Sequence, residues 1–195
     1  RDLRMSRGLG DVYKRQDEYM DIFSVVFQDF KLFALPLGQN VATAQHYDVA
    51  RAADCLQKAG FSDRLARMPK GLDTCLYKDL DEDGVTISGG EAQKIAIARA
   101  LYKDAPFIVL DEPTAALDPV AEAEIYAKFN EIAGDKTAIY ISHRLSSCKF
   151  CDEIAVFDHG EVVQQGTHEE LLGEPDGKYY ELWNAQAQYY TEESA

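Results

Sequence analysis

The sequence has 195 residues, of which 46% are hydrophobic, so it is long enough to bury a core and too apolar to remain disordered. It is strongly acidic, with 34 Asp and Glu against 20 Lys and Arg and a net charge of −14. An acidic surface repels phosphate backbones, which argues against a nucleic-acid-binding protein. No stretch approaches the roughly 18 consecutive apolar residues of a membrane-spanning helix.

Local patterns predict a strand over 22–27. They also predict an irregular segment over 29–46, which contains the helix breakers Pro36 and Gly38. Helices over 47–59 and 62–68 follow, and then a turn-rich acidic connector over 71–84. From residue 88 the expected elements alternate: helix 89–102, strand 107–110, helix 119–133, strand 137–142 and a short helical piece over 145–150. A strand pair over 153–157 and 161–164, a short helix that Thr167 and Glu170 cap, and a helix over 177–190 complete the chain.

Strands that alternate with helices predict an α/β fold with a parallel sheet. The segment 107–110 is apolar without alternation, which is typical of a central strand covered on both faces.

Two adjacent carboxylates, Asp111 and Glu112, follow this strand directly. Ligands of parallel sheets bind at the carboxyl ends of the strands, and His143 ends the next predicted strand at the same edge. A hydrated Mg²⁺ held by Asp111, with Glu112 polarising a water, would offset the cost of two partly buried acids. On this pair alone, two solvated acids at an ordinary strand exit are an equally good reading.

A second candidate site is the run Ser88-Gly89-Gly90-Glu91 at the start of a helix. Ser88 and Glu91 form a capping box, which needs no further function. The two glycines each cost a helix about 1 kcal/mol relative to alanine. Glycines allow backbone N–H groups to approach an anion at the positive end of a helix, so this run favours phosphate binding.

Taken together, the motifs resemble the nucleotide-binding domain of ABC transporters over about residues 20–175. The resemblance depends on five elements in the family's order: Gln28, 87–91, 107–112, 115–118 and His143. It implies a P-loop-NTPase-like parallel sheet with an inserted α-helical subdomain, incomplete at the N-terminus.

The resemblance also implies a site for ATP and Mg²⁺. Asp111 matches the aspartate that holds Mg²⁺, and Glu112 matches the catalytic base. Gln28 matches the glutamine that senses Mg²⁺ and the attacking water and couples to the membrane domain. His143 matches the histidine that contacts the γ-phosphate.

Other matched residues belong to a dimer interface. Ser88, Gly89 and Gly90, with Glu91 in place of the usual glutamine, match the signature that contacts ATP held by a second nucleotide-binding domain. Asp118 matches an aspartate at that interface, although Asp118 before Pro119 is also an ordinary helix start.

The implied organisation is a core strand with the glutamine loop over 17–28, a helical subdomain over 29–87 that docks on transmembrane helices, a core ATPase lobe over 88–175, and a C-terminal helix and tail over 176–195. Residues 143–146 and 160–171 resemble the exporter branch, in which the transmembrane domain is fused upstream, whereas 111–114 is more importer-like. The expected location is the cytoplasmic face of the plasma membrane, with no nucleic-acid partner and an unidentified substrate.

A P-loop, Gly-x-x-x-x-Gly-Lys-[Ser/Thr], is not recognisable. The candidate at 8–15 has Tyr13 in place of the second glycine and Arg15 in place of the hydroxyl residue. Residues 1–16 carry a net charge of +3, which leaves −17 for residues 17–195, and they resemble translated sequencing-adapter sequence. We therefore expect residues 1–16 to be a non-native leader, and the chain as written to bind ATP weakly.

Two alternatives remain. One is the C-terminal lobe of a chromosome or repair ATPase of the SMC type, against which stand the acidic surface and the short spacing between Gln28 and Ser88. The other is a non-catalytic fragment that only competes for partners.

Overall fold

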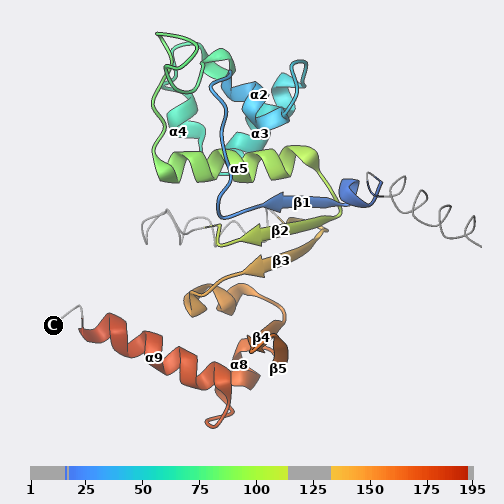
Figure 1. Cartoon of the computed structure of the whole chain (residues 1–195), viewed down its shortest axis with the longest axis vertical. Helices are drawn as coiled ribbons and strands as arrows, with labels where there is room; N and C mark the ends of the chain where they lie inside the picture. Colours follow the sequence, from blue (N-terminus) through green and yellow to red (C-terminus); the bar gives the residue numbers. More distant parts are fainter. Residues whose placement is uncertain (1–15, 17, 114–132, 193–195) are drawn as a thin grey trace, which may run out of the picture. The chain divides into compact units, whose positions relative to one another are not determined.

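The computed structural model describes residues 16, 18–113 and 133–192 (Figure 1). The chain divides into two compact units, one that ends at Ile141 and one that begins at Ser142. No helix in the described part of the chain is long and apolar enough to cross a membrane.

The first unit contains a three-stranded parallel sheet. Its strands are β1 (Phe23–Val26), β2 (Phe107–Asp111) and β3 (Thr137–Ile141), in the order β1-β2-β3. The central strand, β2, buries Ile108 and Leu110. The predicted parallel sheet and its apolar central strand are therefore confirmed.

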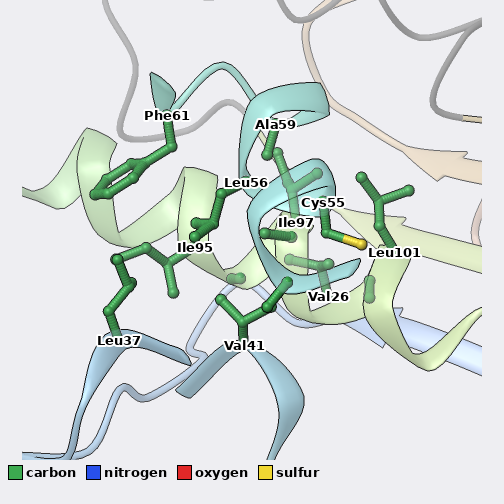
Figure 2. Packing of buried hydrophobic residues seen from close by; sticks show 14 of the residues in the cluster. Val26, Leu37, Val41, Cys55, Leu56, Ala59, Phe61, Ile95, Ile97 and Leu101 are labelled. Carbon is green, nitrogen blue, oxygen red and sulfur yellow. The ribbon is translucent and has the colours of Figure 1, made fainter. Parts of the chain in front are cut away.

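The helices of this unit gather around α5 (Gly89–Lys103), which lies between the sheet and α2 (Leu37–Ala42) and α3 (Val49–Lys58) (Figure 1). The shorter α4 (Ser62–Leu65) and the 3₁₀ helix η1 (Gly71–Asp73) complete the helical part. Because α5 is covered on both sides, its buried residues are not confined to one stripe. Figure 2 shows this core, in which Ile95 and Ile97 of α5 lie near Leu56, Cys55 and Val26.

The expectation of an irregular segment over 29–46 is wrong, because α2 occupies residues 37–42. Pro36 lies just before the helix, where its missing N–H costs nothing, and Leu37 and Val41 bury one face. The buried Asn40 side chain accepts from Phe33 N and donates to the carbonyl of Phe33, which ties the preceding loop to the helix. A helix of six residues is too short for its periodicity to stand out in the sequence.

The second unit has a hairpin and two helices. Strands β4 (Ile154–Asp158) and β5 (Glu161–Gly166) pair antiparallel, after the 3₁₀ helix η2 (Leu145–Phe150). Helices α8 (His168–Leu172) and α9 (Lys178–Glu192) follow. A small core contains Leu145, Ile154, Val156, Leu171 and Tyr179. The predicted strand pair and the capping box of Thr167 and Glu170 are confirmed.

Candidate functional site

The site is built around Glu112, the residue that follows β2. Its φ is +47°, in the left-handed region that a non-glycine residue rarely adopts. The next residue, Pro113, restricts its backbone further. Such a conformation costs about 1–3 kcal/mol and persists only where the surroundings hold it. The backbone N–H of Glu112 donates to the carbonyl of Ile141 at 2.9 Å, so β3 supplies one of these restraints.

The side chain of Glu112 meets Gln28, which lies 84 residues earlier in the sequence. Nε2 of Gln28 donates to Oε2 of Glu112 at 2.8 Å. The parallel register explains the contact, because Val26 pairs with Leu110, and Gln28 and Glu112 each follow two residues after their partner in this pair. A carboxylate can accept several hydrogen bonds, so an amide donor to one oxygen is compatible with a water at the same group.

Asp111 ends β2, in register with Ile141 of β3, and is half-buried. The described residues contain no group of three or more acidic, His or Cys side chains that could enclose a metal ion. Mg²⁺ that also binds phosphate needs only one or two carboxylates, because water and phosphate oxygens fill its other positions. The adjacent carboxylates of Asp111 and Glu112 fit an ion of that kind.

The start of α5 is the second part of the site. The Oγ of Ser88 accepts from the N–H of Glu91 at 3.3 Å, and Glu91 Oε2 accepts from the N–H of Ser88 at 2.9 Å. This is the capping box expected from the sequence. Gly89 is exposed and Gly90 is half-buried in the first turn, where helix N–H groups lack intrahelical acceptors.

Glu91 has a further partner in Arg64 of α4. Arg64 Nε lies 2.9 Å from Glu91 Oε1, at an angle that makes the contact an ion pair rather than a directed hydrogen bond. The Arg64 guanidinium also donates to the carbonyl of Thr86 at 3.2 Å. The negative charge of Glu91, beside the two glycines, is therefore paired with the positive charge of Arg64.

Two predicted site residues, His143 and Asp118, cannot be placed relative to Gln28, Asp111 and Glu112. His143 belongs to the second unit, where its carbonyl accepts a hydrogen bond from the side chain of Gln186. Its approach to Asp111 and Glu112 stays a prediction. Asp118 and the rejected P-loop candidate at 8–15 lie outside the described residues.

Two residues of this region were not predicted from the sequence, Gln93 and Arg64. Gln93 lies on α5 and donates through Nε2 to the backbone carbonyl of Glu112 at 3.1 Å. Gln93 precedes a largely apolar segment over 95–98, but its sequence neighbours do not indicate a partner 19 residues away. Arg64 gave no signal, because its contact with Glu91 depends on how α4 packs.

Comparisons with sequence models, curated proteins and solved structures all find ABC transporters. A sequence model described as "ABC transporter" matches residues 5–115. An ATP-dependent lipid A-core flippase from Idiomarina loihiensis is 43% identical over 169 residues, which cover 84% of this chain and 28% of the flippase. The mitochondrial iron-sulfur clusters transporter ABCB7 of Oryzias latipes is 41% identical over 164 residues, covering 84% of this chain and 21% of that protein.

Among solved structures, a bacterial Atm1-family ABC exporter with ATP bound has a TM-score of 0.76 and 37% identity. The match covers 86% of this chain and 29% of the exporter chain. This structure confirms the predicted P-loop-NTPase-like α/β fold. The chain spans between about a fifth and a third of the length of these relatives.

Proposed function

The chain belongs to the ABC transporter family, and on that premise we propose that it is the ATP-hydrolysing part of an exporter. The relatives at 41–43% identity are full transporters of which this chain spans only a part, so transport itself is proposed for the longer protein. The observation that carries the proposal is the hydrogen bond from Gln28 to Glu112, which joins two family motifs at the carboxyl edge of the sheet.

In the proposed reaction, Glu112 orients a water and takes its proton as that water attacks the γ-phosphate of ATP. Gln28 holds the carboxylate by donating to Oε2. Mg²⁺, when bound by Asp111 and the phosphates, supplies positive charge that offsets the charge developing on the phosphoryl group. His143 is proposed to contact the γ-phosphate.

The start of α5 is proposed to bind the γ-phosphate of ATP held by a second nucleotide-binding domain. Ser88, Gly89 and Gly90 would offer a hydroxyl and backbone N–H groups at a helix N-terminus. A bare carboxylate at Glu91 would repel that phosphate, and the ion pair with Arg64 offsets the repulsion. Asp118 is proposed to lie at the same interface.

The proposed partners follow from the same premise. They are a second nucleotide-binding domain, in a homodimer or a heterodimer, and a transmembrane domain, with the ATPase part at the cytoplasmic face of the membrane. Residues 29–87 are proposed to dock on the transmembrane helices. The lipid and the iron-sulfur cluster named for the relatives are substrates of those proteins, and the substrate of this exporter is unassigned.

The test is the Glu112→Gln variant of the complete transporter, meaning the product of the whole reading frame that contains this chain. We expect its ATP turnover to fall at least 100-fold, because the amide cannot accept the proton, while ATP-dependent association of the nucleotide-binding domains persists. Turnover is measured by phosphate release and association by crosslinking. Asp135→Asn removes an exposed carboxylate elsewhere in the same unit and is the matched control. Full turnover in Glu112→Gln would refute Glu112 as the base.

A further inference from the structure

Gln93 is a polar side chain in an apolar place. It is the fifth residue of α5 and is 2% exposed, and the helix around it buries Ile95, Ala96 and Ile97. A buried carboxamide costs stability unless it is hydrogen-bonded. An apolar side chain of the same length would fill this space without the cost of burying a carboxamide. A role for Gln93 must therefore depend on the hydrogen bonding of its side chain.

The Gln93 side chain donates a hydrogen bond to the backbone of Glu112. Nε2 of Gln93 donates to the Glu112 carbonyl at 3.1 Å. The N–H of the same residue is bonded to Ile141, and its carboxylate accepts from Gln28. Three separate elements thus hold one residue: β3 at the N–H, α5 at the carbonyl, and the loop after β1 at the side chain.

The hydrogen bond to the Glu112 carbonyl restrains an unfavourable backbone conformation. A φ of +47° on a non-glycine residue before a proline is unfavourable in an isolated chain. Rotation about the N–Cα bond of Glu112, which would relieve its positive φ, moves its carbonyl and its Cα–Cβ bond together. The carboxylate then leaves the position at which Gln28 reaches it.

We propose that Gln93 is a positioning residue for the proposed base: its carboxamide fixes the Glu112 peptide in the left-handed conformation and so directs the carboxylate toward Gln28. This inference rests on the proposed function. Gln93 lies five residues after Ser88 on one helix, or about 7.5 Å along its axis. The same rigid element thus carries the proposed γ-phosphate contact and a restraint on the base.

The experiment compares Gln93→Met with the unmutated transporter, in the complete protein. Methionine has nearly the same length and fills the space but cannot donate a hydrogen bond. We expect kcat for ATP hydrolysis to fall about tenfold, the loss that corresponds to one hydrogen bond made in the reactive geometry. We expect KM for ATP and ATP-dependent association of the nucleotide-binding domains to stay within twofold, because Gln93 does not touch the nucleotide in this account.

Two controls separate positioning from packing. Gln165→Met changes an exposed glutamine of β5 that donates to Glu153, and it is expected to leave kcat unchanged. In the Glu112→Gln background, adding Gln93→Met is expected to change the residual rate less than twofold, because no base is left to position. A residue that only fills the core would lower both rates by the same factor. If Gln93→Met does not fold, as judged by circular dichroism, Gln93→Asn carries the same test, because its amide is one methylene too short to reach the carbonyl.

A tenfold loss of kcat that disappears in the Glu112→Gln background supports the inference. An unchanged kcat in Gln93→Met, or an equal loss in both backgrounds, overturns it and leaves the proposed function standing. Absence of ATP hydrolysis by the unmutated transporter, or full turnover by Glu112→Gln, overturns the proposed function and this inference together.

Discussion

The helices α5 and α8 begin with the same local motif and differ in what surrounds it. In each, a hydroxyl side chain, of Ser88 or Thr167, accepts from the N–H of a glutamate three residues later at 3.3 Å. The glutamate carboxylate in turn accepts from the N–H of the capping residue, at 2.9 Å in α5 and 2.8 Å in α8. The hydrogen-bond lengths of the two capping boxes thus differ by no more than 0.1 Å.

Their surroundings set them apart. In α5, glycines occupy the first two helical positions and Arg64 pairs with Glu91. In α8, the first positions are His168 and Glu169, and the Thr167 hydroxyl lies 2.9 Å from the Glu170 carboxylate that it supports. A capping box therefore starts a helix in either place, and the glycines and the counter-charge of Arg64 are the features on which the proposed phosphate site at α5 depends.

The largest expected difference is between Ser88→Ala and Thr167→Ala in the complete transporter. Each substitution removes a cap and costs about 1 kcal/mol, so both are expected to lower the melting temperature by a few degrees. Only Ser88→Ala is expected to lower ATP turnover, by more than tenfold, because the Ser88 hydroxyl is also proposed to contact the phosphate. Calorimetry and phosphate release measure the two effects. Equal turnover in the two variants would remove the functional distinction between the two helices.

A smaller effect is expected from Arg64→Gln, which leaves the Glu91 charge uncompensated. We expect KM for ATP to rise about threefold, and the rise to vanish when Glu91→Gln is added, since no charge then needs offsetting. The pair is partly exposed, with side-chain exposures of 31% and 28%, so its loss should cost stability only about 0.5 kcal/mol.

The matched control for Arg64→Gln is Arg67→Gln. Arg67 is an exposed arginine whose Nε donates to the Asp63 carbonyl, so its replacement removes a positive charge close by without touching Glu91. An equal rise of KM in Arg67→Gln would show that the effect comes from general surface charge and would contradict the pairing argument.

The smallest effect concerns the pH dependence of α8. Hydrogen bonds from the backbone N–H and the hydroxyl of Thr167 lower the pKa of Glu170 below its ordinary value of 4.5. Because the folded pKa is depressed, the stabilisation is present above pH 4.5 and is lost as the pH falls through the folded value. Thr167→Ala removes only the hydroxyl, so we expect the pKa of Glu170 to rise part of the way toward 4.5. An NMR titration of the Glu170 side chain measures it, and an unchanged pKa would contradict the role of the hydroxyl.

The parts of this structure that the sequence predicts are those that local rules determine. The capping boxes, the hairpin and the apolar strand before Asp111 depend on residues close in sequence. The parallel-sheet rule then places Glu112 at the edge where Gln28 also arrives. By contrast, α2 was missed because its one buried face is short.

The contacts of Gln93 and Arg64 could not be predicted for a different reason. Each depends on how a helix packs against a distant segment, and a glutamine or arginine in a helix is locally unremarkable. The left-handed conformation of Glu112 is likewise set by its hydrogen bonds to β3 and α5 and not by its own preference.

The central claim is that Glu112 removes the proton of the attacking water. It is tested most directly by the nucleotide that the Glu112→Gln transporter retains after incubation with ATP and Mg²⁺ and rapid removal of free nucleotide. The account predicts that the retained nucleotide is ATP, held by associated nucleotide-binding domains, whereas the unmutated transporter retains mainly ADP or none. Recovery of ADP from the Glu112→Gln protein in the same proportion as from the unmutated protein would contradict it.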